Sequence, residues 1–85
     1  MKAERKGNAV VITWKEPPDK DLAGYNVYRI GAGSAKRLNT GLTRDTSFID
    51  AVVPDLRYVS YFVTSVDTSG NESGQSRELI VILRE

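Results

Sequence analysis

The side chains that carry most enzyme chemistry are scarce in this chain. It contains no cysteine and no histidine. Zinc sites built from thiolate or imidazole ligands are therefore excluded, as are thiol nucleophiles and triads that need a histidine base. A Ser–Lys arrangement or a pair of carboxylates is the catalytic chemistry that the composition still allows.

Two acidic segments could supply oxygen ligands to a cation. Asp19 and Asp21 lie in the first, and Asp67, Asn71 and Glu72 lie in the second. Ca²⁺ binds several such oxygens, but neither segment has the compact D-x-D-x-D-G ligand loop of a calcium site. Asp and Asn also stabilise turns by bonding to nearby backbone, and this role explains both segments better. We therefore predict no catalytic residue, no metal and no cofactor.

Length and charge limit the class of protein further. A chain of 85 residues forms one domain with a two-layer core, but it has no room for a deep substrate cavity as well. Twelve Lys and Arg against eleven Asp and Glu give a net charge of +1, which leaves no large basic surface for nucleic acid. No apolar run approaches the ~20 residues of a membrane span, and the polar start, Met1 to Asn8, does not form a secretion signal. We expect a single domain over residues 1–85 that binds no nucleic acid and does not insert into a membrane.

Short runs of β-branched and aromatic residues, separated by turn signals, predict an all-β fold. Pro and Gly interrupt the chain about every eight to twelve residues, which is the spacing of a sandwich or small barrel. The runs are Ala9–Trp14, Tyr25–Ile30, Ala35–Leu38, Thr46–Asp50, Tyr58–Asp67 and Glu78–Leu83.

Alternation along these runs assigns a buried face, because successive side chains of a strand point to opposite sides. In the first run the buried side carries a Trp, which is large enough to fill the space between two packed sheets. In the run Tyr58–Asp67, Phe62 points to the other side of the strand from Tyr61 and Val63. The predicted core consists of Val10, Ile12, Trp14, Tyr25, Val27, Tyr61 and Val63. We expect Trp14 to be nearly fully buried.

Three segments, taken in order, resemble a fibronectin type III domain, and most closely the modules of bacterial extracellular proteins. They are Ile12-Thr13-Trp14-x-x-Pro17-Pro18, Asp21-Leu22-Ala23-Gly24-Tyr25-Asn26-Val27-Tyr28-Arg29 and Val63-Thr64-Ser65-Val66-Asp67-x-x-Gly70-Asn71-Glu72-Ser73. The resemblance extends from Ala9 to Leu83. It implies a seven-stranded immunoglobulin-like β-sandwich whose short first strand lies around Ala3–Lys6, with further strands at Gly24–Ile30 and near Lys36–Leu38.

One position departs from this family. Its tyrosine corner, in which a Tyr hydroxyl bonds to upstream backbone, falls on Val59, and Tyr58 lies one residue early. Either a bulge lets Tyr58 serve, or the corner is lost.

The resemblance implies two surfaces on which binding could occur. The strands at 24–30, 58–67 and 78–83 would share one sheet, whose outer side would carry a candidate face formed by Tyr28, Ile30, Phe62, and Ile80 or Ile82. Such a stripe is more apolar than a solvated sheet needs to be, although the stems of Arg29, Lys36 and Arg37 could cover it. The same fold would bring the two acidic segments together at a loop pole.

By this resemblance we expect a non-catalytic structural or spacer module of a larger, exported bacterial protein, located outside the cell or at its surface. Its partners would be the neighbouring domains of the same chain, and the isolated domain would be a monomer. The alternative is a binding module that recognises protein or carbohydrate through the candidate face or the loop pole. An enzyme is not expected, because a small convex sandwich offers no cleft in which paired carboxyls could act.

Overall fold

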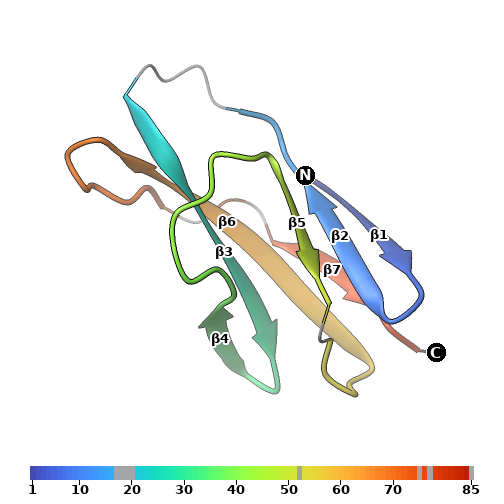
Figure 1. The fold of residues 1–85 in the computed structure, drawn as a ribbon. Helices are drawn as coiled ribbons and strands as arrows, with labels where there is room; N and C mark the ends of the chain where they lie inside the picture. The colour runs from blue at the N-terminus through green and yellow to red at the C-terminus, as the bar shows by residue number, and fades with distance from the viewer. Residues whose placement is uncertain (17–20, 52, 75, 77, 85) are drawn as a thin grey trace.

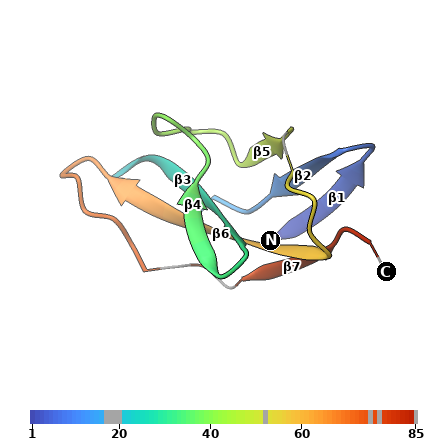
Figure 2. The ribbon, with the colours of Figure 1, turned by 90° about the horizontal axis from the view of Figure 1, so that it is seen from below.

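A computed structural model describes residues 1–16, 21–51, 53–74, 76 and 78–84. Within these ranges the chain forms seven strands: β1 (Lys2–Lys6), β2 (Ala9–Thr13), β3 (Leu22–Gly31), β4 (Ser34–Arg37), β5 (Ser47–Asp50), β6 (Tyr58–Asp67) and β7 (Leu79–Ile82). Their antiparallel pairing gives a sheet of order β1-β2-β5 and a sheet of order β4-β3-β6-β7 (Figure 1). Figure 2 shows the two sheets as separate layers. The prediction of an all-β sandwich is confirmed.

The two longest strands form the backbone of the four-stranded sheet. β3 and β6 pair along nearly their whole length, from Leu22 opposite Asp67 to Ile30 opposite Ser60. Glycine is required near the start of this pairing, because a Cβ at Gly24 would lie 2.9 Å from the Thr43 carbonyl oxygen. No helical segment among the described residues is long and apolar enough to cross a membrane.

A two-residue turn explains why β4 begins earlier than the sequence indicates. Ala32 and Gly33 both have positive φ angles, of 53° and 86°, as a type I′ hairpin turn requires. The turn places Gly31 opposite Ser34, so pairing resumes at Ser34.

The core lies between the sheets and is built by the alternation of each strand. Its buried apolar members are Val10, Ile12, Leu22, Tyr25, Val27, Val59, Tyr61, Val63 and Val81. The structure therefore buries every predicted core residue except Trp14.

The prediction that Trp14 is nearly fully buried is wrong. Trp14 is only partly buried, one residue beyond the end of β2, where it packs edge-on against Tyr25 at 5.3 Å between ring centroids. It borders an open hollow of about 340 Å³, which is also lined by Met1, Lys15 and Ser76. Alternation identified the correct face, but a residue at the end of a sandwich is covered on fewer sides than one at its centre.

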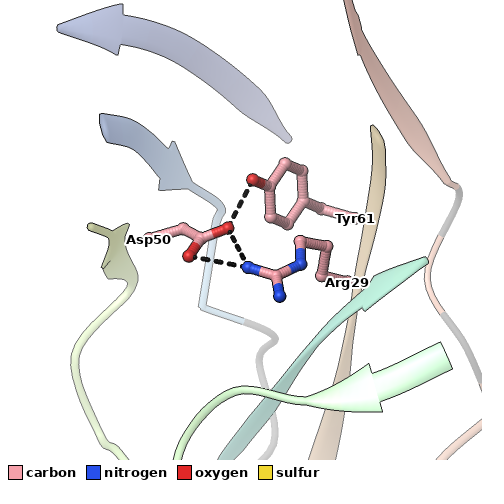
Figure 3. A network of polar contacts seen from close by, with 3 residues as sticks. All are labelled: Arg29, Asp50 and Tyr61. Atoms are coloured by element: carbon pink, nitrogen blue, oxygen red, sulfur yellow. Dashed lines mark hydrogen bonds and ion pairs between the residues drawn. The ribbon is translucent and has the colours of Figure 1, made fainter. Parts of the chain in front are cut away.

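A buried polar cluster, formed by Arg29, Asp50 and Tyr61, joins the two sheets (Figure 3). Arg29 Nη1 lies 3.0 and 2.8 Å from the two carboxylate oxygens of Asp50, and the Tyr61 hydroxyl donates to Asp50 Oδ2 at 2.7 Å. The side chains of Arg29 and Asp50 are only 14% and 5% exposed. Burial, followed by the hydrogen bond to Asp50, raises the pKa of the Tyr61 hydroxyl well above its ordinary value.

The structure corrects one expectation from the sequence and decides between two alternatives. Arg29 does not cover the outer face, because it shares the inward side of β3 with Tyr25 and Val27. Tyr58 does not form a tyrosine corner, since its side chain is 58% exposed and Val59 takes the buried position. The hydroxyl that bonds upstream is that of Tyr61, and its acceptor is a carboxylate rather than backbone.

Candidate functional site

The outer side of the four-stranded sheet collects the residues of the candidate face. Tyr28 on β3 lies opposite Phe62 on β6, and Ile30 lies opposite Ser60. Ser60 in turn lies opposite Ile80 on β7. Ile80 and Ile82 are two residues apart, so both point outward, on the opposite side from the buried Val81. The structure thus places all five predicted residues on one side of the sheet.

In the aromatic pair in the middle of this face, Tyr28 is half-buried and Phe62 is buried. The rings of Tyr28 and Phe62 stack with centroids 4.6 Å apart and an interplanar angle of 12°. Phe62 is only 3% exposed, so the expectation that it offers a binding surface is wrong. Alternation correctly placed its ring on the outer side, but a neighbouring strand supplied a second ring that lies flat against it.

A carboxylate from the loop after β6 closes one end of the face. Glu72 Oε2 accepts hydrogen bonds from the Tyr28 hydroxyl at 2.8 Å, Asn26 Nδ2 at 3.2 Å and Thr64 Oγ1 at 2.5 Å. The bond from Thr64, then those from Tyr28 and Asn26, lower the pKa of Glu72. A general acid needs a raised pKa, so this carboxyl is suited to holding the loop and not to proton transfer at neutral pH.

The sequence did not predict this role for Glu72. A signal was nonetheless present, because Asn26 and Thr64 have the same outward parity as Tyr28 and Phe62. Two polar residues on an otherwise apolar face call for a polar partner.

The accessible part of the face lies toward β7. Ile80 and Ile82 are 62% and 55% exposed, and Tyr58 beside them is also exposed. Ile30 and Tyr58 border a hollow of about 490 Å³ that also contacts Gly31, Leu56 and Glu78. Tyr58 was not predicted here, although its parity with Ser60 and Phe62 identifies it. This surface can make apolar contacts with a partner.

The acidic segments do not form a ligand cluster within the part of the chain that the structure describes. Asp19 lies outside the described residues. Asp67 accepts bonds from the backbone N–H groups of Ser69 and Asn71, which stabilise a turn and lower the pKa of Asp67, and Glu72 points to the sheet instead. No group of three potential metal ligands is found among the residues searched. The bonds of Asp67 are those of a turn residue.

Comparison with solved structures identifies two bacterial proteins with a similar fold. A Fn3-like protein from Clostridium thermocellum is 29% identical, with a TM-score of 0.71 over 87% of this chain and 75% of that chain. A pectate lyase from Pectobacterium carotovorum shares the fold, with a TM-score of 0.76 at 19% identity. That match covers 98% of this chain but only 26% of the lyase. No protein-family model and no curated protein matches the sequence.

Proposed function

Because this chain is a fibronectin type III-like domain, we propose that it is a non-catalytic spacer module of a larger, exported bacterial protein. The observation that carries the proposal is where the chain enters and leaves the sandwich. β1 begins opposite Thr13, at the end of β2. Beyond β7, the amides of Leu83 and Arg84 bond to the Arg57 carbonyl, just before β6 begins. The points at which other domains would attach therefore lie toward opposite ends of the strands.

Rigidity is the second requirement of a spacer. The sandwich is elongated, with principal extents of 41 × 23 × 21 Å. Its two sheets are joined by the buried Arg29–Asp50–Tyr61 cluster as well as by the apolar core. The bacterial structures support the proposal in a coarse way, since the matching fold makes up a quarter of one larger enzyme chain.

The test measures the distance between two labelled reporter domains placed before and after the chain. We expect time-resolved energy transfer to give one narrow distance distribution that broadens only when the domain unfolds cooperatively in urea. A Gly/Ser linker of the same length is the control, and it should give a broad distribution throughout. The spacer proposal fails if the two inserts give equally broad distributions in buffer.

A second candidate function is protein recognition through the accessible part of the candidate face. The observation that favours it is the exposure of Tyr58, Ile80 and Ile82 on adjacent strands. Carbohydrate is the weaker choice of ligand, because Phe62 is buried and one face of the Tyr28 ring is stacked on it. Replacing Tyr58 and Ile82 by Ser should weaken contact with a flanking domain without unfolding the protein, which a pull-down with that domain and a thermal melt would check.

A further inference from the structure

The edge strand β7 differs from the edge strands β1 and β4. β7 ends the order of its sheet, with β6 as its partner among the described residues. Open edges invite pairing with another chain, and proteins protect them with charged residues. β4 carries Lys36 and Arg37, and β1 carries four charged residues in five. β7 reads Leu-Ile-Val-Ile and has no charge within its bounds.

The sequence around β7 is symmetric about Val81. It reads Glu78-Leu79-Ile80-Val81-Ile82-Leu83-Arg84. If a second copy pairs antiparallel with Val81 opposite Val81, each Ile80 meets an Ile82 and each Leu79 meets a Leu83. In the same register each Glu78 meets an Arg84, so opposite charges close both ends of the ladder. Opposite charges at facing positions stabilise antiparallel strands.

The backbone of β7 is oriented for this register. The amide of Leu83 donates to the Arg57 carbonyl on the β6 side. Because amides alternate along a strand, those of Leu79 and Val81 also point to β6, and those of Ile80 and Ile82 point to the open edge. The symmetric register places Ile80 opposite Ile82, so the backbone amides and carbonyls that point to the open edge in one copy meet those of the other copy.

The side chains at the ends of this register are accessible. The side chain of Arg84 is 61% exposed, and its ion-pair partner Asp55, at 3.2 Å, is 90% exposed. Exposed pairs of this kind contribute little, so Arg84 can exchange Asp55 for another carboxylate at small cost. On the outer face the exposed Ile80 and Ile82 of the two copies would form one continuous apolar row.

We propose that β7 is a self-association edge, at which two copies of this chain pair antiparallel about Val81 and join their four-stranded sheets into one. The arrangement is a closed twofold dimer, because pairing leaves neither β7 edge free to bind a further copy. It differs from the expectation, taken from the family resemblance, that the isolated domain is a monomer.

The first test reverses the charges. In Glu78→Arg, an Arg faces Arg84 of the partner, and in Arg84→Glu, Glu78 faces a Glu. Each variant alone should associate about tenfold more weakly than wild type in sedimentation equilibrium. An equimolar mixture of the two restores both attractive pairs, so it should associate about as well as wild type. The control is the mixture of Lys36→Glu and Asp45→Arg, which has the same net charges at exposed positions away from β7.

The second test uses the absence of cysteine in the chain. Ile80→Cys and Ile82→Cys are both at exposed positions, so neither should disturb the fold. Directly opposed residues of a bonded pair have Cα atoms about 5.5 Å apart, within disulfide range. Two copies of the same variant place their cysteines diagonally, beyond about 7 Å. Mild oxidation should therefore give a disulfide-linked species from the mixture and little from either variant alone.

Three results would overturn the proposal. The first is a wild-type protein that stays monomeric up to millimolar concentration. The second is a charge-reversed mixture that associates no better than its components, or a Lys36→Glu and Asp45→Arg mixture that associates equally well. The third is cross-linking of the separate cysteine variants as efficiently as of their mixture, since that would show random collision and not a defined register.

Discussion

At the scale of single residues, the cluster of Arg29, Asp50 and Tyr61 holds an ion pair that is largely shielded from water. A charge removed from water is costly unless it is paired and its hydrogen bonds are satisfied. Here the two contacts of Arg29 Nη1 and the bond from Tyr61 supply both requirements to the Asp50 carboxylate. The three residues come from β3, β5 and β6, so the cluster also sets how the two sheets face each other.

Removing one charge of this cluster should therefore cost more than removing both. We expect Asp50→Leu to lower the free energy of unfolding by ~3–5 kcal/mol, because Arg29 is left buried without its carboxylate. The double variant Arg29→Met, Asp50→Leu should have a clearly higher free energy of unfolding than the single variant, since no unpaired charge remains. Urea unfolding followed by Trp14 fluorescence measures both. If the double variant is the less stable of the two, the cluster is not held by charge pairing.

At the scale of elements, Glu72 decides where the loop between β6 and β7 lies. Its carboxylate joins the loop to Asn26 and Tyr28 on β3 and to Thr64 on β6. The hydrogen bond to Glu72, followed by burial, raises the pKa of the Tyr28 hydroxyl. The loop is thereby held against the sheet by a group that titrates in acid.

This anchor predicts an acid-sensitive contribution to stability. Hydrogen bonds hold the pKa of Glu72 below its ordinary value of 4.5 in the folded chain, so the unfolded chain binds a proton first as the pH falls. The stabilisation is present above pH 4.5 and is lost as the pH falls below it. Wild type should exceed Glu72→Gln in the free energy of unfolding at neutral pH, and the difference should shrink in acid.

Denaturant unfolding of the two proteins at several pH values checks this behaviour. Asp67, whose pKa is also lowered, is present in both proteins and cancels in the difference. A difference that stays constant from pH 7 down through pH 4 to pH 3 would show that Glu72 does not anchor the loop through its charge.

At the scale of the whole molecule, the sandwich is held by pairings between distant parts of the chain. β2 pairs with β5 from Val10 opposite Asp50 to Thr13 opposite Ser47. β3 and β6 lie just as far apart in sequence. The long chain segments between these strands must be brought together, at a cost in entropy, before the stabilising contacts can form.

Folding should accordingly be slow for a chain of this size, on the order of milliseconds to seconds. Trp14 is the only tryptophan and it packs on Tyr25, so its fluorescence reports the joining of β2 to β3. Stopped-flow dilution from urea measures the rate. Folding within microseconds would indicate that local contacts dominate, contrary to the observed topology.

Much of this architecture could be predicted from the sequence, because period-two alternation is a local property. The strand β6 has the predicted bounds, and β5 begins one residue after the start of the predicted run Thr46–Asp50. Strand spacing and turn residues indicated a sandwich or small barrel, and the family resemblance indicated the sandwich. The side of each strand that faces the core was also predictable. So were the faces of Tyr28 and Phe62, whereas the choice between Ile80 and Ile82 was left open.

Depth and partnership were decided only by the tertiary structure. Trp14 and Phe62 were placed on the correct sides, but their exposure was wrong, because burial depends on which strand ends nearby and which ring lies alongside. Arg29 is bonded to Asp50, which lies 21 positions away in the sequence, and Glu72 is bonded to Asn26, which lies 46 positions away. The sequence of a single strand determines to which side each side chain points. The neighbours that bury a side chain, stack on it or bond to it are brought there only by the packing of the two sheets.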